Sequence, residues 1–368
     1  MRILALEPYF GGSHRAFLEG WAGHSRHEFS LLGLPAYKWK WRMRHAGVTL
    51  SRMVAQRADE RESWDVLICS DMLNLAEFRG LAAPEVASLP AVVYFHENQL
   101  TYPQQQAEER DLHFAYTNIV TAHAADAVWF NSAFHRDQFL ESAAAFLKRM
   151  PDYGHAELID EIRNKSTVHP PGVGNFPERG ERRPGPLRIL WAARWEHDKN
   201  PEDFFAAIDR LDRAGVDFRI SVIGESFAEV PRVFAEARKR FADRIDRWGY
   251  QATWEDYADA LLEADVAVST AVHEFFGIGI VEAVVAGAFP VVPRRLAYPE
   301  TLAALDDDDV FYDGSVIGLS ERLRTLAARL QDGMLWRGDP QRGRRAVEEF
   351  AWDRRAAAMD TAIARLHT

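Results

Sequence analysis

The chain has 368 residues, of which 47% are hydrophobic and 27% charged, and its formal net charge is −11. This is the composition of an ordinary globular protein, and the length predicts two domains. The acidic balance argues against a protein whose whole surface coats nucleic acid or an anionic membrane, although it leaves room for a local basic patch.

Cys69 is the single cysteine, so an intrachain disulfide is excluded and we expect a buried thiol. The chain contains no apolar stretch of 18 residues, which predicts no transmembrane helix. It starts directly on a strand-like run and lacks the apolar core and cleavage site of a signal peptide. We therefore expect a protein of the reducing cytoplasm.

Short apolar runs that are typical of strands alternate with helical segments along the chain. These runs are residues 3–6, 29–34, 65–69, 91–95, 127–130, 187–192, 218–223, 266–269 and 289–292. Such alternation predicts parallel sheets with both faces covered. The series restarts at Leu187, after a connection rich in Pro, Gly and Arg. The sequence therefore predicts an α/β protein of two Rossmann-like domains, with ligands at the carboxyl ends of the strands, facing a central cleft.

The first strand leads into a glycine turn, since residues 7–14 read EPYFGGSH. A glycine turn after a first strand often cradles a phosphate or a sugar, which makes Gly12 and His14 candidate ligand contacts. A turn or capping role for Ser13 and His14 is the alternative.

A second polar turn occupies residues 94–103, which read YFHENQLTYP. It brings five polar groups to one strand end, where they are costly unless they are solvated or used. His96 is the candidate active-site residue here, with a satisfied core histidine as the alternative. Asp71 and Asn131 are further candidates because they also follow strands.

Residues 38–44 read KWKWRMR, an unusual basic and aromatic segment in an acidic chain. Cations neutralise phosphates while exposed rings stack on unpaired bases, so the pattern is typical of RNA binding. A solvated basic helix with tryptophans partly in the core is the alternative. The candidate nucleic-acid contacts are Lys38, Trp39, Lys40, Trp41, Arg42 and Arg44.

Two motifs in the second half point to a nucleotide-sugar donor. Residues 193–201 read ARWEHDKNP and place Arg194 and Lys199 on a strand-to-helix loop, where a diphosphate would approach. Residues 273–283 read HEFFGIGIVEA and place Glu274 and Glu282 on either side of a glycine turn that opens a helix. Such a turn is an anion site, and Gly287 is expected to end the helix. An ordinary amphipathic helix with solvated glutamates is the alternative.

This arrangement resembles the Glu-x7-Glu signature of retaining glycosyltransferases of family four, which have the GT-B fold. The resemblance implies that Arg194 and Lys199 hold the donor diphosphate, Glu274 the sugar hydroxyls and Glu282 the ribose, and that His96 contacts the donor sugar. It also implies a nucleotide-sugar pocket formed by Gly12, His14, Gly224, Tyr250, Phe276, Gly277, Ile278, Gly279 and Glu282.

The first-half strings, with FNSAFH at residues 130–135, more closely resemble the tRNA-queuosine alpha-mannosyltransferases, a branch of family four. What this implies is transfer of mannose from GDP-mannose to a cyclopentene hydroxyl of queuosine in the tRNA-Asp anticodon, with retained configuration. No cofactor or metal is required, and no membrane partner is implied. It also implies an acceptor domain at residues 1–172, a donor domain at 173–352 and a final helix at 353–368 that crosses back.

Two other functions remain open from the sequence. One is a family-four transferase that acts on a lipid or small glycan, and the other is a non-catalytic RNA- or sugar-binding protein with the same fold. The acidic run at residues 306–309 is expected to be a solvated surface loop, with a metal site as the alternative.

Overall fold

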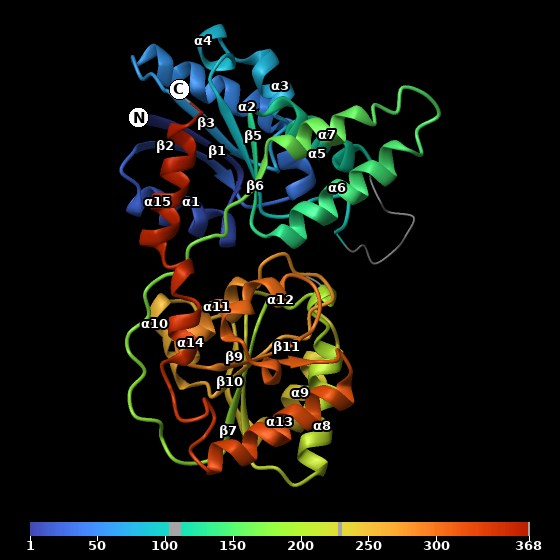
Figure 1. Cartoon of the computed structure of the whole chain (residues 1–368), viewed down its shortest axis with the longest axis vertical. Helices are drawn as coiled ribbons and strands as arrows, with labels where there is room; N and C mark the ends of the chain where they lie inside the picture. Colours follow the sequence, from blue (N-terminus) through green and yellow to red (C-terminus); the bar gives the residue numbers. More distant parts are fainter. Residues whose placement is uncertain (103–111, 227–229, 367–368) are drawn as a thin grey trace. The chain divides into compact units, whose positions relative to one another are not determined.

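The computed structural model describes residues 1–102, 112–226 and 230–366, and its contacts divide the chain into two compact units (Figure 1). The first unit comprises Met1–Gly172 and Trp352–Thr368, and the second comprises Val173–Ala351. Trp352 therefore lies with the first unit, one residue before the predicted boundary of the final helix. Pro103, at the end of the YFHENQLTYP string, and residues 367–368, at the end of the predicted final helix, lie outside the described residues.

The first unit is built on a six-stranded parallel sheet with the order β2-β1-β3-β4-β5-β6. Its strands are β1 (Arg2–Phe10), β2 (Glu28–Pro35), β3 (Val66–Ser70), β4 (Ala91–Phe95), β5 (Ala127–Phe130) and β6 (Ser166–Val168). The sequence predicted the first five, because each is an apolar run. It missed β6, which has three residues, none of them fully buried.

Helices cover both faces of this sheet because successive strand side chains point to opposite faces. Ile3 and Ala5 of β1 pack against helices α1 and α15, whereas Leu4 and Leu6 pack on the side of α2, α3, α5, α6 and α7. The helices are α1 (Gly12–His24), α2 (Trp39–Asp59), α3 (Leu75–Leu81), α4 (Pro84–Ala87), α5 (Leu112–Ala124), α6 (Ala133–Leu147), α7 (Glu157–Asn164) and α15 (Trp352–Ala364).

Trp352 fixes the place of the last helix in the first unit. Its indole lies against Gly20 of α1 and against Gly172, where an added Cβ would come within 2.3 Å and 2.2 Å of ring atoms. Asp360 of α15 accepts a hydrogen bond from the buried Trp21 indole at 2.9 Å. Gly20 and a buried polar contact therefore join α15 to α1, and Figure 1 shows the two helices side by side.

The second unit repeats the plan with a parallel sheet of order β12-β11-β10-β7-β8-β9. Its strands are β7 (Leu187–Ala192), β8 (Phe218–Ile223), β9 (Ile245–Gly249), β10 (Val266–Val268), β11 (Phe289–Pro293) and β12 (Phe311–Tyr312). The sequence missed β9, whose residues IDRWG are mostly half-exposed, and the two-residue β12. Two six-stranded parallel sheets with helices on both faces confirm the predicted fold class.

Helices and 3-10 turns of the second unit surround this sheet. They are η2 (His197–Lys199), α8 (Pro201–Arg213), α9 (Val233–Arg240), η3 (Ala242–Arg244), α10 (Trp254–Glu263), α11 (Ile278–Val285), α12 (Tyr298–Thr301), η4 (Ala303–Leu305), η5 (Asp308–Val310), α13 (Val316–Gln331), α14 (Arg342–Ala346) and η6 (Glu348–Phe350). Gly287 follows α11 with φ 103°, which confirms it as the residue that ends this helix. Cys69 of the first unit is buried, as expected.

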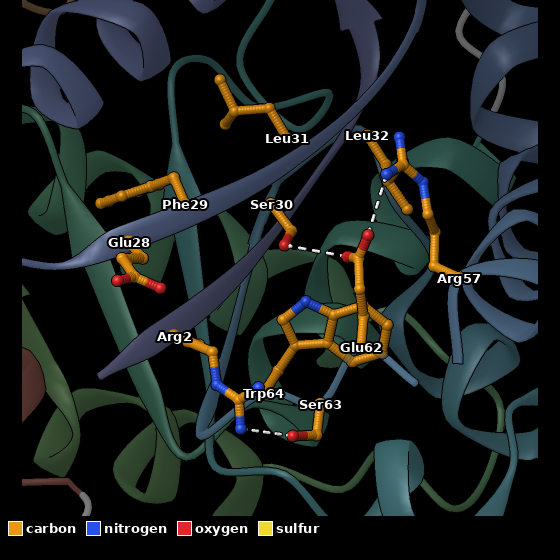
Figure 2. Close-up of a pocket in the computed structure, with 10 residues that line it drawn as sticks. All are labelled: Arg2, Glu28, Phe29, Ser30, Leu31, Leu32, Arg57, Glu62, Ser63 and Trp64. Carbon is orange, nitrogen blue, oxygen red and sulfur yellow. Dashed lines mark hydrogen bonds and ion pairs between the residues drawn. The ribbon is translucent and has the colours of Figure 1, made fainter. Parts of the chain in front are cut away.

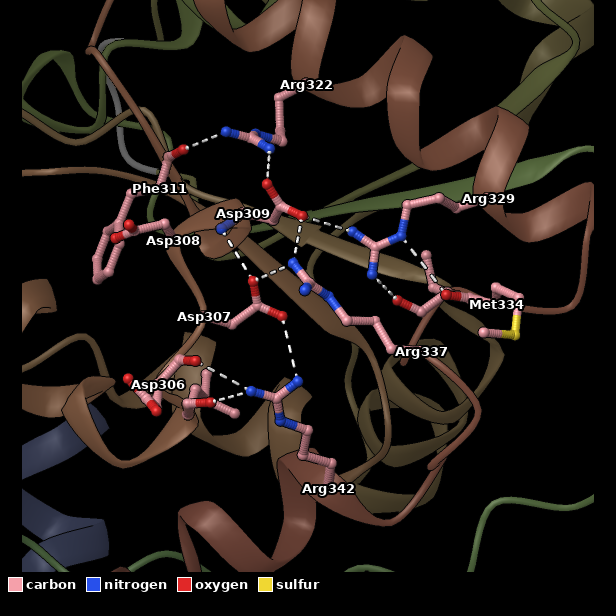
Figure 3. Close-up of polar contacts among 12 residues, drawn as sticks. Asp306, Asp307, Asp308, Asp309, Phe311, Arg322, Arg329, Met334, Arg337 and Arg342 are labelled. Carbon is pink, nitrogen blue, oxygen red and sulfur yellow. Dashed lines mark hydrogen bonds and ion pairs between the residues drawn. The ribbon is translucent and has the colours of Figure 1, made fainter.

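The acidic run at residues 306–309 is only in part the solvated loop that we expected, because Asp306 and Asp308 are exposed whereas Asp307 and Asp309 are paired. Figure 3 shows that arginines from later in the chain converge on it. Asp309 pairs with Arg322, with Arg329 at 3.1 Å and with Arg337 at 2.6 Å, and Asp307 pairs with Arg337 at 2.8 Å. The side chain of Asp307 is only 3% exposed. The run is a carboxylate–guanidinium network that ties η5 to α13, and its cations are side chains of the chain itself.

Among the described residues, none of the helices has both the length and the apolar character needed to cross a bilayer.

Candidate active site

The donor motifs meet at the carboxyl end of the second sheet. Lys199 ends η2, and its Nζ lies 3.2 Å from Glu274 Oε2, 3.1 Å from Asp198 Oδ2 and 3.0 Å from the His273 carbonyl. Burial opposes the charge of Lys199, but the charges of Glu274 and Asp198 outweigh it and raise the Lys199 pKa. The structure thus brings together a lysine and a glutamate that stand 75 residues apart in the sequence.

Glu274 is held as a carboxylate where helix α11 begins. Burial raises its pKa, but the charge and hydrogen bond of Lys199, together with backbone N–H groups of Phe276 and Gly277, lower it overall. Gly277 has φ 84°, a left-handed conformation that favours glycine. An added Cβ at Gly279 would lie 3.3 Å from the Ala192 carbonyl, so the helix start packs closely on the end of β7.

A small cavity of about 30 Å³ marks this junction. Lys199, Glu274, Gly277 and Gly279 all line it. A cation, free backbone donors and the positive end of a helix are the components of an anion site. Phe276 is buried, and its ring packs edge-on against Phe350 with centroids 5.2 Å apart, which makes its side chain a core residue. Ile278 begins α11 and packs against the core of the unit.

Arg194 lies on the same loop but farther out. Its side chain is 41% exposed, and its Nη2 lies 3.2 Å from Glu196 Oε2. A diphosphate that approached this loop would meet a half-exposed guanidinium before it reached the buried Lys199.

Glu282 has a partner that sequence reasoning missed. Tyr257 of α10 donates its hydroxyl to Glu282 Oε2 at 2.6 Å. Burial raises the pKa of Glu282 to about 7, although the hydrogen bond from Tyr257 lowers it in part. No sequence pattern signals a pair 25 residues apart on two different helices. Glu282 is therefore not one of the solvated glutamates of the alternative interpretation.

Gly224 and Tyr250, both predicted to line the nucleotide-sugar pocket, differ in their surroundings. Gly224 has φ 148°, and an added Cβ would lie 1.8 Å from the Ala193 carbonyl, so packing of adjacent strand ends already requires glycine there. The side chain of Tyr250 is 68% exposed and follows β9. Tyr250 therefore has a side chain that is open to solvent, whereas Gly224 is explained by packing.

The first unit gathers its polar residues at the carboxyl ends of β1, β3 and β4. Glu7 Oε2 lies 3.1 Å from His14 Nδ1, and Glu7 Oε1 accepts hydrogen bonds from Ser70 Oγ at 2.9 Å and from the Tyr9 N–H at 2.8 Å. The rings of His14 and His96 have centroids 4.0 Å apart. Glu7 belongs to the EPYFGGSH string, but its position gave no sign of the role that it has as partner of His14.

The two histidines are held in opposite protonation states. Burial lowers the pKa of His14, but the charge and hydrogen bond of Glu7 outweigh it and raise this pKa to about 9. Burial lowers the pKa of His96 well below its usual value, and the nearby His14 and His135 lower it further. His14 is thus an imidazolium and His96 a neutral imidazole at neutral pH. Gly12, at φ 51°, begins α1 beside them.

The other strand-end candidates position the turn that carries His96. Asp71 Oδ1 accepts a hydrogen bond from the His96 backbone N–H at 2.9 Å, and Asn131 Nδ2 donates to the His96 carbonyl at 3.0 Å. Asp71 is fully buried, and burial raises its pKa to about 8. Both residues therefore act on His96 through its backbone.

Glu7, His14 and His96 also form a group whose potential metal-ligand atoms lie within 4.8 Å of one another. The sequence showed no such spacing. Nδ1 of His14 is engaged with Glu7, and a protonated imidazole has no lone pair to offer a metal. The group therefore fits an ion pair stacked on a neutral histidine better than it fits a metal centre.

The basic segment divides into an exposed and a packed part. Lys38 and Lys40 are exposed, and Trp41 is 62% exposed. Trp39 instead packs on Phe114, with ring centroids 5.3 Å apart. The segment begins helix α2, with Lys38 at φ 51° as the residue before it.

The two arginines of the segment both have contacts within the first unit. Arg42 Nε donates to the Pro35 carbonyl at 2.9 Å, and the guanidinium of Arg44 lies over the Phe114 ring at 5.0 Å. One tryptophan and both arginines of the segment are therefore structural as well as basic.

Two larger cavities lie at the opposite ends of the sheets. One of about 440 Å³ lies beside edge strand β2, where Figure 2 shows Arg57 paired with Glu62 and Arg2 paired with Ser63. Another of about 460 Å³ lies beside Asp265, which precedes β10. Asp265 pairs with two arginines of the connection that follows Val173, at 2.9 Å and 2.8 Å. Neither cavity contains a predicted site residue.

The polar residues of the first unit and the donor motifs of the second are thus each assembled within their own unit. The prediction that His96 faces the donor across a cleft stays a prediction.

Each half of the chain matches a family of known proteins. Residues 2–173 match a family model described as tRNA-queuosine alpha-mannosyltransferase N-terminal, and residues 175–328 match the model of glycosyl transferases group 1. The chain is 35% identical over 313 residues to a Drosophila melanogaster tRNA-queuosine alpha-mannosyltransferase, covering 81% of each chain. It is 29% identical over 244 residues to a Mycobacterium tuberculosis GDP-mannose-dependent alpha-(1-6)-phosphatidylinositol dimannoside mannosyltransferase, covering 66% of this chain and 59% of that one.

Solved structures show the same fold at low identity. A sucrose-phosphate synthase from Thermosynechococcus elongatus superposes with a TM-score of 0.73 at 14% identity, covering 100% of this chain and 99% of the other. Anabaena HepE in complex with UDP superposes with a TM-score of 0.66 at 16% identity, covering 99% of each chain. Together with the donor motifs, these matches establish a glycosyltransferase of the GT-B fold, and the chain belongs to the tRNA-queuosine alpha-mannosyltransferase family.

Proposed function

We propose that this protein transfers mannose from GDP-mannose to a cyclopentene hydroxyl of queuosine in the anticodon of tRNA-Asp, with retention of the anomeric configuration. The observation that carries the proposal is the 35% identity to the Drosophila enzyme over 313 residues, a match longer than either unit. The Mycobacterium relative, which is named as GDP-mannose-dependent, supports the choice of donor.

The donor is proposed to bind at the start of α11. Lys199 and the backbone N–H groups that follow Gly277 hold the diphosphate, and Arg194 closes over it from the exposed side of the loop. Glu274 accepts hydrogen bonds from mannose hydroxyls, since Lys199 and backbone N–H groups keep it ionised. Glu282 accepts from the ribose. As the diphosphate departs, these fixed cations and dipoles stabilise the negative charge that develops on it.

The chemical step is proposed to occur on one face of the sugar. The bond between the anomeric carbon and the phosphate oxygen breaks through an oxocarbenium-like state, while the acceptor oxygen bonds to the same carbon from the same side. The hydroxyl proton passes to the departing phosphate, so the step requires neither a metal ion nor a pair of carboxylates arranged for double displacement. His96, as a neutral imidazole, is proposed to contact the sugar near the reacting carbon.

The tRNA is proposed to contact the exposed part of the basic segment. Lys38 and Lys40 lie beside the exposed rings of Tyr37 and Trp41. Cations of this kind neutralise phosphates, and exposed rings stack on anticodon bases that are not paired. Trp39 contributes by packing the segment onto the first unit.

A transferase that acts on a lipid or a small glycan is the second candidate, because the Mycobacterium relative is named for a phosphatidylinositol dimannoside. It would turn over GDP-mannose without tRNA and would leave the exposed cations and rings of α2 without a role. A non-catalytic binding protein is disfavoured by the paired Lys199 and Glu274.

The test is an assay of donors against acceptors. The protein is incubated with GDP-mannose and with tRNA-Asp that either contains or lacks queuosine, and released nucleosides are analysed by mass spectrometry. We expect a hexose on queuosine only. Transfer to a lipid or glycan acceptor, with none to queuosine, would establish the second candidate and contradict the first.

A further inference from the structure

The end of the first sheet holds more negative charge than its cations neutralise. Three carboxyl groups gather there: Glu7 at the end of β1, Asp71 after β3 and Glu97 after β4. His14 of α1 is the imidazolium among them, and it is engaged by Glu7 at 3.1 Å. His96 adds no positive charge to the cluster, because burial keeps its imidazole neutral. Burial raises the pKa of Asp71 to about 8, so Asp71 is largely protonated at neutral pH, and the two carboxylates Glu7 and Glu97 share the single imidazolium of His14.

Two fully buried polar atoms in this cluster have no hydrogen-bond partner within residues 1–102, 112–226 and 230–366. They are Oδ2 of Asp71 and Nδ2 of Asn98, and both residues are 0% exposed. The orphaned carboxylate oxygen is costly in an apolar environment unless something binds near it. Burial raises the pKa of Asp71, the charge of His14 lowers it and the charge of Glu97 raises it, so Glu97 and His14 both lie close enough to Asp71 to act on it.

The turn that carries Glu97 is held rigidly. Asn98 Oδ1 accepts hydrogen bonds from the Leu100 and Thr101 backbone N–H groups, both at 3.0 Å, and Asn118 Oδ1 accepts from the Gln99 N–H at 2.8 Å. Glu97 itself is half-buried, and its contact with a described side chain is a hydrogen bond from Gln99 Nε2 at 3.2 Å. A partly exposed carboxylate on a fixed turn is suited to bind a ligand.

The negative charge of this cluster favours a cationic ligand over an anionic one. GDP-mannose and the tRNA backbone are both anionic, and neither gains from two acids. The queuosine side chain, in contrast, contains a secondary amine, protonated at neutral pH, that joins the base to the cyclopentene ring bearing the acceptor hydroxyls. From this geometry we infer that Glu97, backed by Asp71, binds the ammonium group of the acceptor and so places the cyclopentene hydroxyls for transfer. This inference rests on the proposed function and identifies the recognition site for its acceptor.

The experiment compares Glu97→Gln with the wild type and with Glu85→Gln, a matched change at an exposed residue of α4. KM and kcat are measured separately for GDP-mannose and for queuosine-containing tRNA. We expect Glu97→Gln to raise KM for the tRNA by about 10-fold or more, with KM for GDP-mannose unchanged, because only the charged acceptor loses its partner. Glu85→Gln should behave as wild type.

A second acceptor isolates the charge itself. In tRNA whose queuosine amine has been N-acetylated, the nitrogen is a neutral amide. The wild type should discriminate against this tRNA, and Glu97→Gln should discriminate about 10-fold less, which is the coupling expected of an ion pair. Repeating the assay with a chelator tests whether the cation bound by Glu97 is an ammonium group or a divalent metal ion. We expect the chelator to have no effect on activity.

The outcomes separate the inference from the proposed function. A wild-type protein that adds no hexose to queuosine overturns both. If the wild type is active, an unchanged KM for tRNA in Glu97→Gln, or a rise confined to KM for GDP-mannose, overturns the inference alone. Loss of wild-type activity on chelation would overturn it as well.

Discussion

Replacing Tyr257 by phenylalanine removes a single hydroxyl and tests the role proposed for Glu282. The hydroxyl donates to Glu282 Oε2 at 2.6 Å within the second unit. Because burial has already raised the pKa of Glu282 to about 7, about half of this carboxyl is ionised at pH 7. The ionised form is the better acceptor of ribose hydroxyls, so donor affinity should increase as the pH rises through 7.

The size of the effect follows from the strength of the hydrogen bond. A hydroxyl that donates to a charged carboxylate is worth roughly 1.5–3 kcal/mol, or about 1–2 pKa units. Without it, the pKa of Glu282 should rise to about 8–9, and the ionised fraction at pH 7 should fall to roughly 1–10%. KM for GDP-mannose at pH 7 should then increase about 5- to 50-fold, whereas at pH 9 the difference should fall to about twofold or less.

The assay is a pH profile of KM for GDP-mannose at saturating queuosine-containing tRNA. Tyr153→Phe is the matched control, because Tyr153 is 83% exposed and belongs to the other unit. A Tyr257→Phe protein with the same KM as wild type at every pH would refute the role of Glu282. A uniform rise at every pH would show that Tyr257 acts through packing and not through the charge of Glu282.

Three further changes have distinct expected results. Lys199→Ala should lower kcat about 10²- to 10³-fold, since it removes the fixed charge that stabilises the leaving group. Lys239→Ala, a change at an exposed residue of α9, should leave kcat unchanged, and near-normal turnover of Lys199→Ala would rule out the role assigned to Lys199. Trp41→Ala should weaken tRNA binding by roughly 1–3 kcal/mol in a gel-shift titration without changing donor KM, and unchanged affinity would contradict stacking. Gly20→Ala should drive a methyl group into the Trp352 indole and destabilise the first unit by about 1–3 kcal/mol, seen as a lower midpoint in thermal unfolding; an unchanged midpoint would show that α15 shifts at no cost.

The fold was predictable because its central strands are apolar runs bounded by turns. β4 (Ala91–Phe95) and β5 (Ala127–Phe130) were placed to the residue, since every side chain in them is buried. The missed strands β6, β9 and β12 are edge or outer strands that are short or half-exposed. Each of them is held by pairing with a neighbouring strand, and the amino-acid composition of the segment itself does not reveal that pairing.

The site was predictable only where a motif is local. Lys199 and Glu274 were expected to share a ligand, and the structure shows that they contact each other, but whether they hold a diphosphate stays a prediction. The pairs Glu7–His14 and Tyr257–Glu282 could not be foreseen, because each depends on how separate elements pack and neither has a recurrent spacing. For the same reason the pairing of Asp307 and Asp309 was not foreseen, because their arginine partners lie 13 to 35 residues farther along the chain.

A net acidic chain can bind tRNA where its cations are exposed and locally concentrated, because the formal charge of −11 describes the whole chain and not each part of its surface. Asp265, Asp307 and Asp309 are paired with arginines of the same unit, so these ion pairs add little to the field that an approaching tRNA meets. The exposed cations at the start of α2 act on the tRNA over a Debye length of about 8 Å. With so small a basic patch, the affinity must depend on short-range contacts to the anticodon. A binding site for the one cationic group of queuosine would supply such a contact, and unmodified tRNA, which lacks that group, would gain nothing from it.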